Sequence, residues 1–240
     1  MTDDECRREV SVAGRVLAGH GHSDLVWGHV ALRDPAGQGI WIKRSGIGFE
    51  EVQPEDVQLV GWDGSLLDGH GSVHLEHHIH TEVMRARPDV TCSLHTHPEA
   101  AVVFASLGVP LVAIAHEATL FAPPDVARFT ATGDLIRDAE LGRAVATSLG
   151  ARNALLLVNH GIVVVGSSCD EAVLAAVLLE KACRMQLAAM SAAPGARLLV
   201  SSEDEALAKR DRCYSPTQME HGAGYLRRML DGGGEASGAR

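Results

Sequence analysis

The chain has 240 residues, of which 46% are hydrophobic and 22% charged, a balance typical of a globular protein with a sizeable core. Its formal net charge of −10, with no basic stripe to offset it, argues against a protein that follows nucleic-acid phosphates. The five cysteines are scattered without a CxxC pair, and neither a secretory signal nor a membrane-length apolar run is visible, so we expect a cytoplasmic protein with reduced thiols and no membrane partner.

Hydrophobic periodicity predicts helices alternating with short strands. Helices are expected over residues 5–17, 72–87, 99–107, 138–149, 170–189, 203–212 and 224–230. Strands are expected over residues 26–32, 39–43, 58–62, 90–97, 111–115, 154–158 and 162–165, with a short helical turn at 54–56 and a Pro-containing loop at 121–133. This order predicts an α/β fold, a three-layer α/β/α sandwich around a central, mainly antiparallel sheet. We expect one domain over residues 1–230, followed by a disordered Gly-rich tail at 231–240.

The strongest local signal is the His95-Thr96-His97 segment at the end of the 90–97 strand. Residues i and i+2 of an extended segment lie on the same face, so His95 and His97 point the same way, as two ligands of one metal ion would. Chance pairing is a real alternative, because seven of the thirteen histidines lie between His70 and His97. However, an unpaired imidazole pair beside a core is costly, which favours metal binding.

Two further signals are weaker when each is taken alone. Glu76 and His80 lie four residues apart and share a helix face, although a carboxylate there could simply be solvated and His80 could serve only to orient a ligand. His160 follows the apolar run 154–158 and precedes Gly161, a position that is also typical of an ordinary turn residue. Together, one carboxylate and three histidines on three elements are typical of a borderline-metal site with an open position.

The sequence resembles the class II aldolase/adducin family over approximately residues 10–189. Four motifs carry the resemblance, in this order: Glu76, Arg87-Pro88-Asp89-Val90, His95-Thr96-His97-Pro98 and Asn159-His160-Gly161. The resemblance implies a fold with a nine-stranded sheet and a homo-oligomer, usually a tetramer. It also implies a divalent ion held by His95, His97 and His160, with Glu76 as the catalytic acid or base. Zinc is the expected ion, with manganese, cobalt or iron as alternatives.

The chain departs from the sugar-phosphate aldolases of this family where they hold the substrate phosphate. Their Gly-Asn-x-Ser-x-Arg segment is Gly28-His29-Val30-Ala31-Leu32-Arg33 here, and their Thr-Pro-Thr-Gly loop is Lys43-Arg44-Ser45-Gly46. Their serine pair before the glutamate is replaced by His74-Leu75, and a leucine cannot donate a hydrogen bond. We therefore expect a substrate without phosphate, either an oxygenated carboxylic acid or a hydroxy-carbonyl compound. The candidate substrate-binding residues are His29, Arg33, Ser45, Gly46, His74, His116 and Tyr214.

These features predict a divalent-metal-dependent carbon–carbon lyase that acts through an enolate-type intermediate. The lost phosphate cradle favours decarboxylation of a small hydroxylated carboxylic acid, with an aromatic acid as one option, a pattern that resembles the non-phosphate decarboxylases of the family. The alternatives are an aldolase for an unphosphorylated hydroxy-carbonyl substrate and, less favoured, a non-haem iron oxygenase or a sugar-phosphate aldolase or epimerase. A non-catalytic scaffold of the adducin type is disfavoured, because a scaffold has no need of an open metal position.

Overall fold

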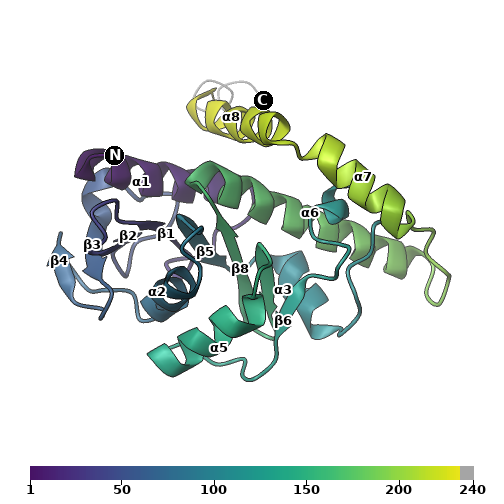
Figure 1. Ribbon diagram of the computed structural model, residues 1–240, viewed down its shortest axis with the longest axis horizontal. Coiled ribbons are helices and arrows are strands. Elements are labelled where there is room, and N and C mark those ends of the chain that lie inside the picture. The colour runs from purple at the N-terminus through teal and green to yellow at the C-terminus, as the bar shows by residue number, and fades with distance from the viewer. Residues whose placement is uncertain (233–240) are drawn as a thin grey trace.

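Eight strands form one sheet in the computed structural model, which describes residues 1–232 (Figure 1). The strands are β1 (His29–Arg33), β2 (Gly39–Lys43), β3 (Val57–Gly61), β4 (Leu66–Asp68), β5 (Cys92–Thr96), β6 (Ala127–Phe129), β7 (Ala154–Leu157) and β8 (Gly161–Gly166). Their order across the sheet is β4-β3-β2-β1-β5-β8-β7-β6. Neighbouring strands are antiparallel except for the parallel pair β6 and β7, which confirms the predicted sheet type. In the described residues the sheet has eight strands rather than the nine that the resemblance implied.

Helices cover both faces of this sheet (Figure 1). They are α1 (Asp3–Gly19), α2 (His77–Ala86), α3 (Glu99–Ser106), α4 (His116–Thr119), α5 (Ala139–Leu149), α6 (Cys169–Ala192), α7 (Glu203–Cys213) and α8 (Pro216–Gly232), with a short 3-10 turn at Pro54–Asp56. Helices α2 and α5 pack on one face, whereas α1, α3, α6 and α8 bury their apolar residues in the core on the other face. The predicted three-layer α/β/α sandwich is therefore confirmed. In residues 1–232, every helix is too short or too polar to cross a bilayer.

Alternation along β5 decides which side chains reach which layer. Cys92 and Leu94 belong to the core beneath α1, α3 and α6. Ser93 and His95 therefore point to the opposite face, toward α2, because successive side chains of a strand alternate. Antiparallel pairing places His29 of β1 opposite His95. The sheet thus carries a row of polar side chains beneath α2, beside an otherwise apolar core.

Several elements differ from the prediction for identifiable physical reasons. Residues 111–115 were expected to form a strand but have no strand partner: the Leu111 N–H donates to Asp125 Oδ1, and the Val112 N–H donates to Gln186 Oε1. Side chains therefore take the place of a neighbouring strand for these backbone groups. Conversely, the expected loop 121–133 contains β6, which pairs with β7.

Two helix boundaries also differ. Helix α2 begins at His77 rather than at residue 72, so Glu76 occupies the N-cap position and not the helix interior. Helix α8 runs from Pro216 to Gly232 and includes the first two residues of the predicted tail. The rest of that tail, residues 233–240, lies outside the described residues.

Candidate metal centre

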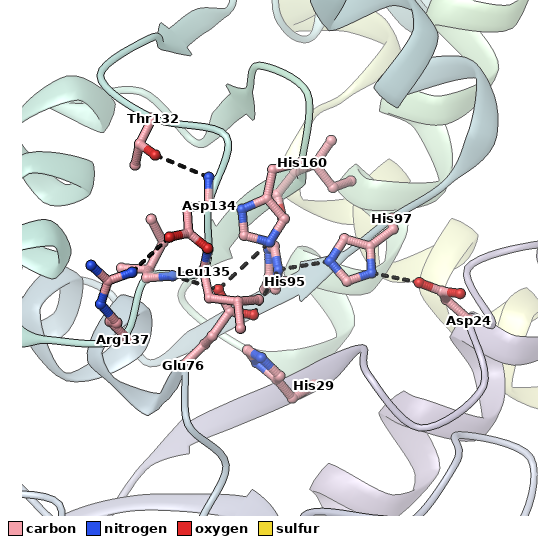
Figure 2. A network of polar contacts seen from close by, with 12 residues as sticks. Asp24, His29, Glu76, His95, His97, Thr132, Asp134, Leu135, Arg137 and His160 are labelled. Atoms are coloured by element: carbon pink, nitrogen blue, oxygen red, sulfur yellow. Dashed lines mark hydrogen bonds and ion pairs between the residues drawn. The ribbon is translucent and has the colours of Figure 1, made fainter.

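Three histidines from two distant segments of the chain meet at the ends of interior strands of the sheet (Figure 2). His95 lies in β5, His97 follows directly after β5, and His160 lies in the turn between β7 and β8. Because β5 and β8 are antiparallel neighbours, the end of β5 lies beside the beginning of β8. One ligand atom from each histidine lies within 4.8 Å of the others. The structure therefore brings together the three residues that the sequence marked as metal ligands.

Hydrogen bonds fix the tautomers of the first two rings. His95 Nδ1 lies 2.9 Å from the Ile162 carbonyl oxygen, and His97 Nδ1 lies 2.8 Å from Asp24 Oδ2. Both oxygens only accept, so each Nδ1 carries a proton, and in a neutral ring each Nε2 then carries a lone pair. The two Nε2 atoms lie 3.0 Å apart. Two lone pairs at this distance repel each other, and a cation between them would turn the repulsion into shared coordination.

The third ring, that of His160, has no hydrogen bond that fixes its tautomer: both of its ring nitrogens are buried without a partner. Burial, together with the neighbouring His97, lowers the pKa of His160 to about 4. Burial also holds the pKa of His95 well below its ordinary value. Neutral imidazoles with free lone pairs are the form that binds a metal, so the three residues fit a divalent ion.

Glu76 lies beside these ligands and is itself buried, with 5% of its surface exposed. Its Oε1 accepts a 2.8 Å hydrogen bond from the Ile136 N–H and lies 3.5 Å from His160 Nε2. Its Oε2 lies 3.7 Å from His95 Nε2. Burial raises the pKa of Glu76 above its ordinary value, although the Ile136 hydrogen bond opposes this shift. A carboxyl group in this position can hold or release a proton next to a bound substrate.

The turn that presents His160 depends on a glycine. A Cβ atom on Gly161 would lie 2.6 Å from both His97 Cδ2 and the Thr96 carbonyl oxygen. The preceding Asn159 has a φ of 60°, which closes the tight turn between β7 and β8. The close approach of this turn to β5 is therefore possible only because residue 161 has no side chain.

Two of the predicted substrate-binding histidines lie next to this centre. His29 is fully buried, and its ring centroid lies 4.2 Å from that of His74 and 5.1 Å from that of His95. Both ring nitrogens of His74 are buried without a hydrogen-bond partner. The turn containing Ser45 and Gly46 is joined to the segment before Glu76, since the Ser45 N–H donates to the Ser72 carbonyl oxygen at 2.9 Å.

The other predicted binding residues have different surroundings. Arg33 donates to the carbonyl oxygens of Met84, Arg87 and Val90, and thereby braces the end of α2. These bonds use Nε and Nη2 of the guanidinium group, and the assignment of Arg33 to substrate binding stays a prediction. His116 Nδ1 lies 3.4 Å from Cys213 Sγ, where α4 meets α7.

Tyr214 directly follows α7, and burial raises the pKa of its phenol. Within residues 1–232, no hydrogen bond or ion pair joins His116 or Tyr214 to the three histidines or Glu76. Their assignment to substrate binding stays a prediction.

Asp24 and Ser93 are polar neighbours of the centre that the sequence did not reveal. Asp24 orients His97 from the loop after α1, and no motif marks it. Ser93 could have been noticed, because it precedes His95 by two residues and therefore shares its face of β5.

Comparison with known proteins places the chain among lyases. The sequence model of the Class II Aldolase and Adducin N-terminal domain matches residues 8–187. The chain is 31% identical over 218 residues to a 3,4-dihydroxyphthalate decarboxylase of Arthrobacter keyseri, covering 85% of this chain and 86% of the relative. It is 33% identical over 203 residues to the 3,4-dihydroxyphthalate decarboxylase of Rhodococcus jostii, covering 80% and 83%.

Among solved structures, the L-fuculose 1-phosphate aldolase from Glaciozyma antarctica PI12 superposes with a TM-score of 0.84 at 27% identity, covering 95% of this chain and 89% of that one. The fold, the matched residues and the named relatives agree with the resemblance seen in the sequence. The chain belongs to the class II aldolase and adducin family, whose lyases depend on a divalent metal.

Proposed function

We propose that this protein is a divalent-metal-dependent lyase that decarboxylates a small hydroxylated, aromatic carboxylic acid. The observation that carries the proposal is the pair of Nε2 lone pairs of His95 and His97, which face each other at 3.0 Å beside the buried Glu76. We propose zinc as the ion, because three neutral imidazoles with an open coordination position suit a borderline metal.

The surroundings of the centre favour a substrate without phosphate. Small hydroxyl groups would hold a phosphate, but here His29 and His74 lie beside the centre and Leu75 is 53% exposed without any donor. The two relatives named 3,4-dihydroxyphthalate decarboxylases act on an aromatic ring that bears hydroxyl and carboxyl groups. A substrate of the same kind, with neighbouring oxygens for the ion and a carboxylate to lose, agrees with the residues around the centre.

When bound, the divalent ion would act as a Lewis acid that stabilises the negative charge developing as the carbon–carbon bond breaks. His95, His97 and His160 would hold that ion through Nε2 of the first two rings and a ring nitrogen of the third. Glu76 gives its proton to the ring carbon that bears the carboxylate, because burial favours its protonated form. The bond to the carboxylate then breaks, carbon dioxide leaves, and the bonding electron pair passes into the ring toward the hydroxyl oxygen, which restores the aromatic ring.

The Ile136 N–H anchors Oε1 of Glu76, so the Glu76 carboxyl group keeps a fixed direction while it exchanges its proton. Aldol cleavage of an unphosphorylated hydroxy-carbonyl substrate is the second candidate, and the structural likeness to a fuculose-phosphate aldolase favours it. It would use the same residues, with Glu76 exchanging a proton with a substrate hydroxyl or carbon. The two reactions differ in their product, since only decarboxylation releases carbon dioxide.

The test is a product assay with the protein loaded separately with zinc, manganese, cobalt or iron. Hydroxylated benzoic and phthalic acids are compared with phosphorylated and unphosphorylated hydroxy-carbonyl compounds, and the His97→Ala variant serves as the control. We expect metal-dependent release of carbon dioxide from at least one hydroxylated aromatic acid. Cleavage of the hydroxy-carbonyl compounds alone would replace decarboxylase by aldolase, and metal-independent turnover would reject the proposed centre.

We also propose a homotetramer in the cytoplasm, built from a single domain over residues 1–230. Support for an oligomer comes from the exposed side chains of Leu25, Trp27 and Leu75, which flank Asp24 and Glu76 in the sequence. Apolar side chains exposed next to a polar centre are typical of a surface that another subunit covers. Light scattering after size exclusion would measure the mass, and a monomer at micromolar concentration would contradict the proposal.

A further inference from the structure

A hydrogen-bonded chain of three buried side chains runs beneath α2 and ends beside the metal centre. Ser93 Oγ lies 2.8 Å from His80 Nδ1, and His80 Nε2 lies 2.6 Å from His29 Nδ1. All three residues have 0% of their surface exposed. The last atom of the chain, His29 Nε2, is buried without a hydrogen-bond partner. This chain of hydrogen bonds therefore begins at the Ser93 hydroxyl group and ends at His29 Nε2. The hydrogen bonds of His80 and Ser93 determine whether that nitrogen carries a proton.

The direction of this chain follows from the hydroxyl group. Every imidazole carries at least one N–H, and the short contact between His80 Nε2 and His29 Nδ1 holds one proton, so one of these two nitrogens donates and the other accepts. Within the described residues, the Ser93 hydroxyl has His80 Nδ1 as its hydrogen-bond partner. If it accepted from His80, its own proton would be buried beneath α2 with no acceptor, which is costly. In the opposite direction the one unpaired N–H of the chain is that of His29 Nε2, beside Glu76 and the metal centre. The hydroxyl therefore donates to His80, His80 Nε2–H donates to His29 Nδ1, and His29 keeps its proton on Nε2.

The surroundings of His29 agree with this direction. A ring nitrogen of His29, an oxygen of Glu76 and a ring nitrogen of His95 all lie within 4.8 Å of one another. Since Nδ1 of His29 is engaged by His80, Nε2 is the nitrogen that faces this group, and Figure 2 shows the His29 ring turned toward Glu76. A carboxylate oxygen and the Nε2 lone pair of His95 attract an N–H and repel a second lone pair. His29, Glu76 and His95 have the spacing of a metal site, but a ring that presents an N–H cannot be a ligand.

We propose that Ser93 and His80 hold His29 as a fixed Nε2–H donor, and that this donor binds a carboxylate oxygen of the substrate beside the metal centre. The inference rests on the proposed function, and it names the substrate feature that the site selects. His29 is the binding residue, whereas His80 and Ser93 are positioning residues that act through it. A neutral donor with a predetermined tautomer is ready to bind an anionic oxygen without rearrangement, which strengthens the bond.

Nitrogen-15 NMR of the zinc-loaded protein tests the direction of the chain, because protonated and unprotonated ring nitrogens have distinct chemical shifts. The resonances are assigned by their loss in His29→Gln and His80→Gln variants. We expect the proton on Nε2 in both rings of the wild-type protein. In Ser93→Ala, the fixed direction is lost and His29 should populate both tautomers. A wild-type His29 with its proton on Nδ1, or with Nε2 bound to zinc, would overturn the proposal.

Phthalate, a dicarboxylate that lacks the reacting hydroxyl groups, is the probe for carboxylate recognition. Calorimetry with the zinc protein should show binding that weakens about 10- to 100-fold in His29→Phe, which removes the donor to a charged group, and about twofold in Ser93→Ala, where half of the His29 rings carry the other tautomer. Zinc content should not change. Ser93→Thr, which keeps the hydroxyl group, should restore binding, and Ser11→Ala, which removes a buried hydroxyl group of α1, should leave it unchanged.

Equal binding of phthalate by the wild-type and His29→Phe proteins, or no binding by either, would contradict the role of His29. These measurements need no turnover, so they separate the two proposals. If no acid releases carbon dioxide while the tautomer and the phthalate binding are as expected, the decarboxylase proposal fails and the donor role stands. If carbon dioxide is released but His29 carries its proton on Nδ1, the donor role fails and the decarboxylase proposal stands.

Discussion

His29 of β1 lies directly opposite His95 of β5 in the antiparallel register, and their ring centroids are 5.1 Å apart. One rung of the sheet therefore carries both an imidazole of the candidate metal centre and the last imidazole of the buried Ser93–His80–His29 chain. Strand pairing fixes the separation of these two rings more firmly than loops could. The predictions below test the parts of this arrangement separately.

Removing the charge behind His97 should weaken metal binding. In Asp24→Asn, the acceptor of the His97 Nδ1–H loses its negative charge, and loss of such a partner typically lowers metal affinity about 10- to 100-fold. Competition with a chromophoric chelator would measure the zinc dissociation constant. Asp63→Asn, an exposed carboxylate held by Ser65, is the control and should bind zinc as the wild type does. An unchanged constant in Asp24→Asn would show that His97 needs no orienting partner.

Replacing Glu76 should separate binding from chemistry. Glu76→Gln keeps the size of the side chain and an oxygen that can accept the Ile136 N–H, but it cannot exchange a proton. We expect normal zinc content and a kcat lower by about 10²- to 10⁴-fold, the usual contribution of a general acid or base. Zinc analysis and steady-state kinetics on the same preparation provide both values. Turnover at the wild-type rate would reject the role of Glu76.

Adding a methyl group at residue 161 should push the β7–β8 turn away from β5. The Cβ of Gly161→Ala would lie 2.6 Å from the Thr96 carbonyl oxygen, so backbone atoms must move. We expect a loss of stability of about 1 to 3 kcal/mol, as for other overpacked sites, together with weaker zinc binding. Gly19→Ala, where a Cβ meets nothing within 4 Å, is the matched control. Thermal unfolding with and without zinc would measure both effects, and equal behaviour of the two variants would contradict the argument.

Acid should destabilise the metal-free protein through His22, which is fully buried and whose Nδ1 lies 2.9 Å from Thr96 Oγ1. Burial lowers its pKa to about 4 in the folded protein, from an ordinary value of 6.5. Between these values the unfolded chain binds the proton and the folded protein does not, so the free energy of unfolding falls as the pH drops from 6.5 toward 4. The contribution of His22 is about 3 kcal/mol.

Urea unfolding at several pH values in this range would measure that slope in the presence of a chelator. His22→Asn should make it shallower, whereas His70→Asn, at an exposed position, should not change it. An equal slope in the His22→Asn and wild-type proteins would show that His22 does not carry the acid sensitivity.

Much of the fold and of the metal centre could be predicted because their signals are local. The spacing of His95 and His97 on an extended segment is visible in the sequence, and apolar periodicity predicted most helices and strands. The prediction of a strand at the apolar residues 111–115 was wrong. Periodicity reports burial and cannot show that Asp125 and Gln186 take the place of a strand partner. Strand β6 was missed since three residues in a Pro-containing loop carry almost no pattern.

The rest of the site depends on contacts between distant segments. Asp24 reaches His97 across 73 positions, and His29 meets His80 across 51. Such contacts follow from the register of β1 against β5 and from the placement of α2 over the sheet, which no short motif encodes. For the same reason the sequence position of Arg33 could not show that its guanidinium group donates to three carbonyl oxygens at the end of α2.

Strand β5 separates two different environments. Cys92 and Leu94 point into the apolar core, whereas Ser93 and His95 point toward the polar row beneath α2. A single residue inserted before Cys92 would exchange the two faces of β5, so that the His95 imidazole would enter the apolar core and the Leu94 side chain would point toward the metal centre. Insertions here should be far less tolerable than substitutions of similar size. The alternation of side chains along β5 therefore determines whether the metal centre can form at all.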